Sequence, residues 1–167
     1  GYYKDAENTA KTIKDGWLYT GDYGYLDEDG FLYITGRKKN VIVTKGGKNI
    51  FPEEVEYYLL LSEFISEVIV YGKHEEVKDD LICTAIMYPD YKALENAGCM
   101  TDEEKYRKLK EAVDEANSKM PPFKRVKRIE IREDGFIKTT TLKIKRFEEE
   151  NYEYKFDDRD FEKGRRF

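Results

Sequence analysis

Three parts of the sequence place charged or hydroxyl side chains beside apolar residues, and the first two also contain glycine. The first spans residues 16–22, the second runs through residues 30–40 and 46–56, and the third spans residues 139–146. Carboxylate oxygens can accept hydrogen bonds from a vicinal diol, whereas guanidinium and ammonium groups bind oxyanions. These segments are therefore the first candidates for binding hydroxyl groups and anions.

Other common catalytic and metal motifs are incomplete. His74 is the only histidine, which argues against a histidine-based metal cluster or a catalytic triad. Gly47-Lys48 resembles the end of a phosphate-binding loop. That motif, however, needs glycine where Ile42 stands and serine or threonine where Asn49 stands. We assign no metal ligand in this chain.

A cluster of basic residues lies around the start of the strand expected at residues 126–131. It consists of Lys124, Arg125, Lys127 and Arg128. Charged side chains alternating along a strand are typical of a solvated sheet edge. They also suit a contact with a polyanion such as a nucleotide phosphate. The sequence leaves both interpretations open.

The composition is that of a globular domain. The 167 residues suffice for one ordinary domain with a small appendage, and 39% of them are charged. The formal net charge of −5 provides no general attraction to nucleic acids or anionic membranes. No apolar run approaches the ~20 residues that span a bilayer, and the first residues do not resemble a signal peptide. We expect no nucleic-acid partner and no transmembrane segment.

The two cysteines indicate a reducing compartment. Cys83 and Cys99 have no metal-binding spacing and do not make a disulfide framework. Cys83 lies in an apolar stretch, where we expect a small core residue. A reduced, cytoplasmic protein is the simplest interpretation. The first residue is Gly1 and not Met, which suggests a piece excised from a longer chain.

The helices and strands that position the candidate residues belong to three expected parts of the chain: residues 1–36, 37–150 and 151–167. In residues 1–36 a helix is expected over 5–13, and apolar pairs flank the turn signal 27–30, where Gly30 can supply the positive φ of a hairpin. A helix and a hairpin bury little alone, so we expect this part to be the end of a large N-terminal domain.

Residues 37–150 have the pattern of an α/β (α+β) domain, which we expect to be mobile. The expected elements are a strand at 41–43, a helix from Pro52, strands at 68–71 and 81–88, a helix over 102–119 and a strand at 126–131. Thr101 and Glu104 have capping-box spacing at the start of the long helix. These elements predict a small mixed sheet flanked by helices. Residues 151–167 form a C-terminal extension without assigned structure.

In order and spacing, the three candidate segments resemble the adenylate-forming superfamily, which includes acyl-CoA synthetases, firefly luciferase and nonribosomal-peptide adenylation domains. The resemblance covers roughly residues 1–147. Within the superfamily the chain is most similar to bacterial long-chain fatty acid–CoA ligases, on residues 46–50 and 141–146. Most of the superfamily has glycine where Leu142 stands, whereas leucine is common there in long-chain ligases.

The resemblance implies the carboxyl-terminal part of an ATP-dependent ligase. In such an enzyme a fatty acid and ATP form an acyl-adenylate with the help of Mg²⁺, and CoA then displaces AMP. The chain has no Ser/Thr/Gly-rich phosphate loop and no acyl pocket. We therefore expect the fragment to be inactive alone, with the fatty acid, ATP and Mg²⁺ bound mainly by its own N-terminal domain.

The resemblance also implies roles for single residues. Asp22 is implied to accept hydrogen bonds from the ribose hydroxyls, with a turn residue as the alternative. Arg37 is implied to contact the ribose or phosphate region, with a structural salt bridge as the alternative. Lys143 is implied to offset the repulsion between the carboxylate and the α-phosphate during adenylation.

Three further residues are implied to serve the second half-reaction. Lys39 stands at the hinge position, where backbone rotation would exchange two working arrangements. Gly46 and Gly47 are implied to line the channel for the pantetheine arm of CoA, with an ordinary tight turn as the alternative.

Two other functions share these features. An adenylation domain that loads a carrier protein would contain all three segments. A free-standing, noncatalytic interaction module would also fit a chain of this length. Thioester assays with CoA and with a carrier protein separate the first alternative from a CoA ligase.

Overall fold

The structure is a computed structural model that describes residues 1–75, 80–146 and 156–157. The chain forms two compact units, one of residues 1–40 and one that begins at Val41. The domain boundaries expected after residues 36 and 150 stay predictions, and most of the extension 151–167 lies outside the described residues.

The first unit opens with helix α1 (Ala6–Thr12) and the short antiparallel strands β1 (Ile13–Lys14) and β2 (Trp17–Leu18). The helix begins where the Asp5 carboxylate accepts a hydrogen bond from the backbone N–H of Asn8 at 3.0 Å. This confirms the helix expected over residues 5–13.

A hairpin follows, formed by β3 (Asp22–Leu26) and β4 (Leu32–Arg37). Its turn is closed by Asp27, whose side chain accepts a hydrogen bond from the N–H of Phe31 at 2.8 Å. Gly30 has a φ of 84°, as the turn signal predicted. Because these contacts span at most a few residues, the sequence alone was sufficient to predict the hairpin.

The first unit has no apolar core of its own. None of the apolar side chains of residues 1–40, all of which the structure describes, is buried. Large side chains such as Trp17 and Phe31 are exposed. A short helix and isolated two-stranded pairs are marginal without a packed apolar face, so this unit needs another surface for stability.

The second unit is built on a mixed sheet with the strand order β10-β9-β8-β7. The strands are β7 (Ile65–Glu75), β8 (Asp80–Pro89), β9 (Arg128–Ile131) and β10 (Phe156–Asp157). β8 is antiparallel to β7 and parallel to β9, and β9 is antiparallel to β10. The expected strands at 68–71 and 81–88 are confirmed, each within a longer strand.

Helices connect and cover these strands. They are α2 (Pro52–Leu59), α3 (Tyr91–Asn96), α4 (Asp102–Ser118) and the 3₁₀ helix η2 (Pro122–Lys124). α2 begins at Pro52 and α4 has the capping box of Thr101 and Glu104, as predicted. The crossover from β8 to the parallel strand β9 runs through α3 and α4, as a parallel pair requires.

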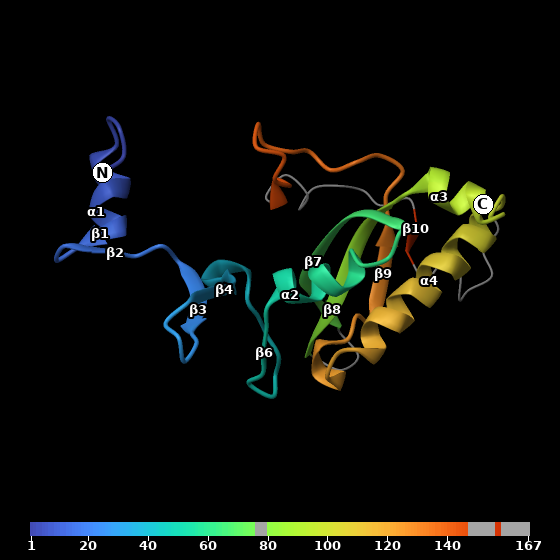
Figure 1. The fold of residues 1–167 in the computed structure, drawn as a ribbon, viewed down its shortest axis with the longest axis horizontal. Helices are drawn as coiled ribbons and strands as arrows, with labels where there is room; N and C mark the ends of the chain where they lie inside the picture. Colours follow the sequence, from blue (N-terminus) through green and yellow to red (C-terminus); the bar gives the residue numbers. More distant parts are fainter. Residues whose placement is uncertain (76–79, 147–155, 158–167) are drawn as a thin grey trace. The chain divides into compact units, whose positions relative to one another are not determined.

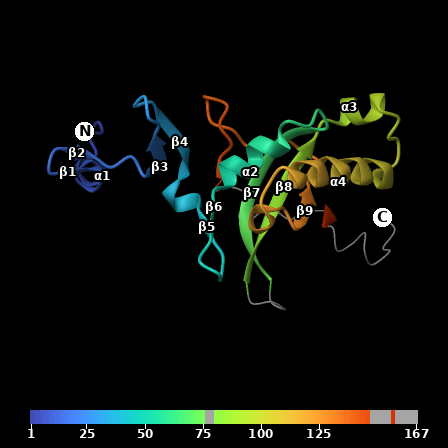
Figure 2. The same ribbon diagram turned by 60° about the horizontal axis from the view of Figure 1, so that its bottom comes forward.

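The main core lies between one face of the sheet and helices α2 and α4, which lie beside β7, β8 and β9 (Figures 1 and 2). It includes the fully buried Val55 and Leu59 of α2, Ala85 and Met87 of β8, and Leu109 of α4. The apolar side chains of α2 and α4 recur at helical spacing, which places them on the face that packs against the sheet. The mixed α/β fold expected from the sequence is thereby confirmed.

The opposite face of the sheet carries a smaller cluster. Its buried members are Ile69, Ile86 and Phe136, and Tyr71, Tyr88 and Ile144 pack against them. Phe136 and Ile144 come from the segment that follows β9. This segment therefore covers the second face, and it leads to the third candidate segment.

β9 differs from the solvated strand edge that its alternating charges suggested. It is paired with β8 on one side and β10 on the other, so Arg128 and Glu130 are only 9% and 1% exposed. Glu130 accepts hydrogen bonds from the Tyr71 hydroxyl at 2.8 Å and from the Lys73 ammonium. The solvated-edge interpretation is wrong for Arg128, because a strand between two others has no free edge.

Candidate functional site

Asp22 and Arg37 are direct neighbours across the β3–β4 hairpin. Their Cα atoms form a register pair, and the Arg37 Nε lies 2.8 Å from Oδ1 of Asp22. The Asp22 backbone N–H also donates to the Thr20 hydroxyl at 3.1 Å, which shapes the entry into β3. The structural salt bridge considered for Arg37 is thus present. The contact also aligns a carboxylate and a guanidinium side by side, which is the donor and acceptor set that a ribose phosphate requires.

Lys39 lies at the end of the first unit. It belongs to the 3₁₀ helix η1 (Lys38–Asn40), whose first backbone N–H donates to the carbonyl of Gly21 at 2.8 Å. The second compact unit begins at Val41, immediately after this helix. A residue at such a boundary is well placed to absorb a backbone rotation between two units.

The glycine pair occupies a hairpin turn at the start of the second unit. Strands β5 (Ile42–Val43) and β6 (Asn49–Ile50) are antiparallel, and residues 44–48 join them. The turn is closed by hydrogen bonds from the N–H of Gly47 to the Thr44 carbonyl at 2.8 Å and from the N–H of Thr44 to the Lys48 carbonyl at 3.0 Å.

The two glycines of this turn differ in their backbone conformation. Gly47 has a φ of 71°, whereas Gly46 is not among the residues with positive φ. A Cβ placed on Gly46 would meet only the Thr44 hydroxyl, at 4.0 Å. The turn therefore requires glycine at 47 and leaves open space for a side chain at 46.

A carboxylate outside the turn fastens it to the sheet. The backbone N–H of Lys45 donates to Oδ1 of Asp80, the first residue of β8, at 2.8 Å. This hydrogen bond is the main cause that lowers the pKa of Asp80. The turn is thus held at its second residue while Gly46 and Gly47 stay exposed.

Lys143 lies on a small hairpin. Lys138 and Ile144 form an antiparallel bridge, and the N–H of Thr139 donates to the Lys143 carbonyl at 2.8 Å. The Lys143 N–H in turn donates to the Thr139 hydroxyl at 3.2 Å. Lys143 is exposed, so the hairpin presents this lysine at the surface of the unit.

Leu142, directly before Lys143, has a strained backbone. Its φ is 62°, in the left-handed region, and its side chain is 79% exposed. This conformation costs a residue with a Cβ roughly 1–2 kcal/mol. The structure thus explains on physical grounds why glycine suits this position. It also shows that the turn forms with leucine there.

The predicted basic cluster is divided between different environments. The Lys124 ammonium contacts Glu54 of α2 at 2.7 Å. It also lies 5.8 Å from the centre of the Phe123 ring, and the Lys48 ammonium lies 6.0 Å from the same ring centre. Arg128 is buried in the sheet instead. The polyanion contact of this cluster remains a prediction, and it cannot involve all four side chains on one surface.

In residues 1–75, 80–146 and 156–157, no group of three or more histidine, cysteine or acidic side chains is arranged to hold a metal ion. Over the same residues no helix is both long and apolar enough to cross a membrane.

The structure brings together only some of the predicted site residues. Asp22 and Arg37 are in contact on the first unit, whereas Lys143 belongs to the second unit. Sequence reasoning missed Glu56 and Glu67, which contact the segment that carries Lys143. No local pattern indicates these contacts, because their partners are 90 and 71 residues away.

A family model described as the AMP-binding enzyme C-terminal domain matches residues 39–152. The chain is 36% identical over 146 residues to a long-chain-fatty-acid–CoA ligase of Bacillus subtilis, which covers 87% of this chain and 23% of that protein. It is 43% identical over 86 residues to a 2-succinylbenzoate–CoA ligase of a Geobacillus strain, which covers 52% of this chain and 17% of that protein. The chain thus spans about a quarter or less of the length of these relatives.

A solved structure shows the same similarity. The o-succinylbenzoate CoA synthetase of Bacillus subtilis, in complex with its acyl-adenylate intermediate, superimposes with a TM-score of 0.67 at 26% identity. The match covers 86% of this chain and 26% of that one.

Proposed function

Because the chain belongs to the family of AMP-binding enzyme C-terminal domains, we propose that it is the mobile carboxyl-terminal part of an AMP-forming acyl-CoA ligase. In the first half-reaction, a carboxylate oxygen attacks the α-phosphorus of ATP and pyrophosphate leaves. In the second, the thiol of CoA attacks the acyl carbon and AMP leaves. The observation that carries this proposal is the exposed Lys143 at the turn of its own hairpin.

Lys143 acts in the first half-reaction. The carboxylate and the α-phosphate are both anionic, and their approach is opposed by electrostatic repulsion. An ammonium group placed between them offsets this repulsion most strongly where water is excluded and charge develops in the transition state. Lysine suits this role because it is a compact charge on a flexible stem.

Asp22 and Arg37 bind the nucleotide. The two carboxylate oxygens of Asp22 match the vicinal hydroxyls of the ribose. The Arg37 guanidinium, 2.8 Å from Asp22, orients that carboxylate and adds donors toward the ribose or phosphate oxygens. The ion pair between them thus has a function in binding.

Lys39 and Gly46 serve the exchange between half-reactions. Rotation at Lys39, beside the boundary of the two compact units, removes Lys143 from the reacting atoms and brings the turn of residues 44–48 to them. The exposed backbone at Gly46 then lines the path of the pantetheine arm, where a missing Cβ permits close approach.

A long-chain fatty acid is the proposed substrate. The similarity to the long-chain ligase extends over 146 residues, against 86 for the 2-succinylbenzoate ligase. The acyl pocket, the ATP phosphates and Mg²⁺ are assigned to the N-terminal domain of the ligase. We also propose that the 167 residues do not catalyse alone, since they contain no Ser/Thr/Gly-rich loop for the ATP phosphates.

The test is a substrate panel on the complete ligase that contains this chain. Purified enzyme is supplied with ATP, Mg²⁺ and either palmitate or 2-succinylbenzoate, and pyrophosphate and thioester are measured with CoA or a carrier protein as acceptor. We expect palmitoyl-CoA. A thioester on the carrier alone would assign the chain to an adenylation domain, and no pyrophosphate with any acid would overturn the ligase proposal.

A further inference from the structure

The hairpin that carries Lys143 is too small to hold its own position. It has one bridge, between Lys138 and Ile144, and a turn that contains the strained Leu142. Two-stranded hairpins are marginal in water unless they pack on other elements. Ile144 packs against the smaller core cluster, whereas Leu142 and Lys143 are exposed. Other contacts must therefore fix the direction of this turn.

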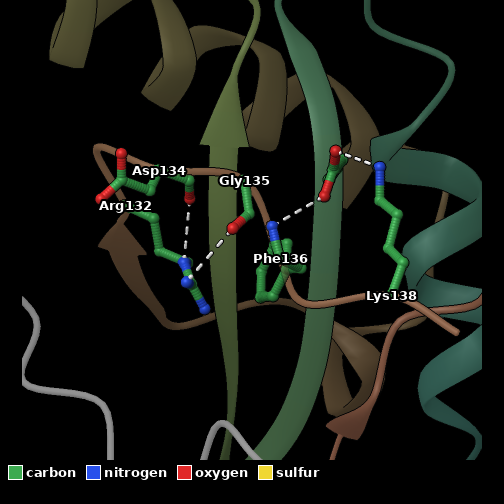
Figure 3. A network of polar contacts seen from close by, with 6 residues as sticks. Arg132, Asp134, Gly135, Phe136 and Lys138 are labelled. Carbon is green, nitrogen blue, oxygen red and sulfur yellow. Dashed lines mark hydrogen bonds and ion pairs between the residues drawn. The ribbon is translucent and has the colours of Figure 1, made fainter.

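One carboxylate holds the entry to the hairpin. Glu67 of β7 accepts a hydrogen bond from the backbone N–H of Phe136 at 3.0 Å, and its other oxygen lies 2.5 Å from the Lys138 ammonium (Figure 3). Arg132 stabilises the turn directly before Phe136. Its guanidinium donates hydrogen bonds to the carbonyls of Asp134 and Gly135 at 3.1 and 3.4 Å. The Glu67 side chain is 15% exposed, which limits the access of water to its carboxylate, while the Lys138 side chain is 35% exposed.

A second carboxylate holds the exit. The guanidinium of Arg146 contacts both oxygens of Glu56 on α2, at 2.6 and 2.5 Å, and donates to the Val70 carbonyl at 3.2 Å. Glu56 also accepts the N–H of Val70 at 2.7 Å. Its side chain is 12% exposed. Burial raises the pKa of Glu56, and the charge of Arg146 opposes that shift.

These two contacts bracket Lys143 closely in sequence. Lys138 lies five residues before it and Arg146 three residues after it. The carboxylates come from α2 and β7, which belong to the core of the unit. Each carboxylate combines a charge-assisted contact with a hydrogen bond from a backbone N–H, and the two together restrict both distance and orientation. The two contacts therefore fix both ends of the hairpin that carries Lys143 relative to the core.

We propose that Glu56 and Glu67 are positioning residues for the adenylation half-reaction. By holding both ends of the hairpin, they fix the backbone from which Lys143 reaches the reacting carboxylate and phosphate. This inference rests on the proposed role of Lys143. A lysine stem is long and flexible, so the reach of its ammonium depends on where its backbone is held, and displacements near 1 Å reduce rates strongly.

The structure offers a matched control. Glu54 lies on the same helix as Glu56 and contacts the Lys124 ammonium with both oxygens at 2.7 Å, but this pair does not involve the hairpin. Glu54→Gln therefore removes a comparable ion pair of α2 without releasing the Lys143 hairpin.

The experiment compares Glu56→Gln, Glu67→Gln and Glu54→Gln in the complete ligase. It measures acyl-adenylate formation, thioester formation from supplied acyl-adenylate, and hydrogen exchange of peptides that cover residues 137–146. We expect the first two variants to lose at least tenfold in the kcat of adenylation, to stay within twofold in thioester formation, and to exchange faster in these peptides. Glu54→Gln should show none of these changes.

Two results would overturn the inference. Faster exchange with unchanged adenylation would mean that the carboxylates only stabilise the fold, and unchanged exchange would mean that they do not hold the hairpin. If a glutamine variant fails to fold, the milder Glu56→Asp supplies the same measurements, with a smaller loss of adenylation expected. Failure of the proposed function is recognised separately, because Lys143→Ala would then leave adenylation intact whatever the exchange rates show.

Discussion

Arg37 lies directly opposite Asp22 in the β3–β4 hairpin, with its Nε 2.8 Å from Oδ1 of the carboxylate. The two side chains are 53% and 22% exposed. An ion pair this accessible contributes about 0–1 kcal/mol to stability, because water screens it and both side chains lose entropy. The pair is therefore of little use for holding the hairpin, which agrees with a role in nucleotide binding.

Asp22→Ala should separate binding from stability. In the complete ligase we expect nucleotide affinity to fall by about 1.5–3 kcal/mol, the value of a hydrogen bond to a charged group. The melting temperature should change little. Titration calorimetry with AMP measures the affinity, and Glu28→Ala in the turn of the same hairpin is the control. Unchanged affinity for Asp22→Ala would exclude the ribose contact.

Lys143→Ala should separate the two half-reactions. Loss of one electrostatic contact to the transition state should slow acyl-adenylate formation by ~10²–10³. Thioester formation from supplied acyl-adenylate should be largely spared. Pyrophosphate release and thioester yield are measured separately, with the exposed Lys92→Ala on α3 as the control. An equal loss in both steps would contradict the assignment.

Substitution of the two turn glycines should give opposite results. Gly46→Leu meets open space and no positive φ, so stability should hold while thioester formation stalls and acyl-adenylate still forms. Gly47→Ala places a Cβ at a φ of 71° and should lower stability by about 1–2 kcal/mol. Melting curves and the two half-reaction assays test both. A Gly46→Leu enzyme with full thioester activity would remove this glycine from the CoA path.

The strain at Leu142 predicts a stabilising substitution. Asparagine tolerates the left-handed region better than leucine, so Leu142→Asn should raise stability by up to about 1 kcal/mol. Little burial is lost, because the Leu142 side chain is 79% exposed. Leu142→Ala keeps a Cβ without the polar group and should bring no gain. Urea unfolding of the unsubstituted protein, Leu142→Asn and Leu142→Ala measures the difference in stability. Equal unfolding midpoints for all three would contradict strain at this residue.

Cys83 should be unreactive in the folded protein. Burial raises the pKa of this thiol from 9.0 to about 12. At pH 9 the thiolate fraction is then roughly 10⁻³, where an unshifted thiol would be half ionised. We expect a thiol reagent to label the partly exposed Cys99 first and Cys83 only on unfolding in urea. Equal labelling rates in the native protein would contradict the burial of Cys83.

The same shift sets a pH dependence of stability. A raised pKa means that the folded state holds its proton more tightly than the unfolded state. The contribution of Cys83 is therefore complete below pH 9 and is lost as pH rises toward about 12. Cys83→Ala should flatten the alkaline decline of the melting temperature, and an unchanged slope would assign that decline to other groups.

The sequence by itself determined the elements whose causes are local. The capping box of Thr101 and Glu104, the helix start at Pro52 and the turn at Gly30 each depend on residues within a few positions. The helical spacing of apolar residues likewise determines which face of α4 is buried. The three candidate segments were found in the same way, because the residues of each lie close together in the sequence.

Only the tertiary structure decided how these elements act on one another. A solvated edge was one of the two interpretations open for Arg128, but β9 lies between two strands, and the order of strands in a sheet is not encoded in any one of them. The contact of Glu56 with Arg146 joins residues 90 positions apart. Such contacts exist only after the chain has closed long loops and packed its core, and the collective free energy of that packing selects them. The backbone strain at Leu142 has the same origin. Its φ of 62° is imposed by the hairpin that Lys138 and Ile144 close, and leucine alone does not favour that conformation.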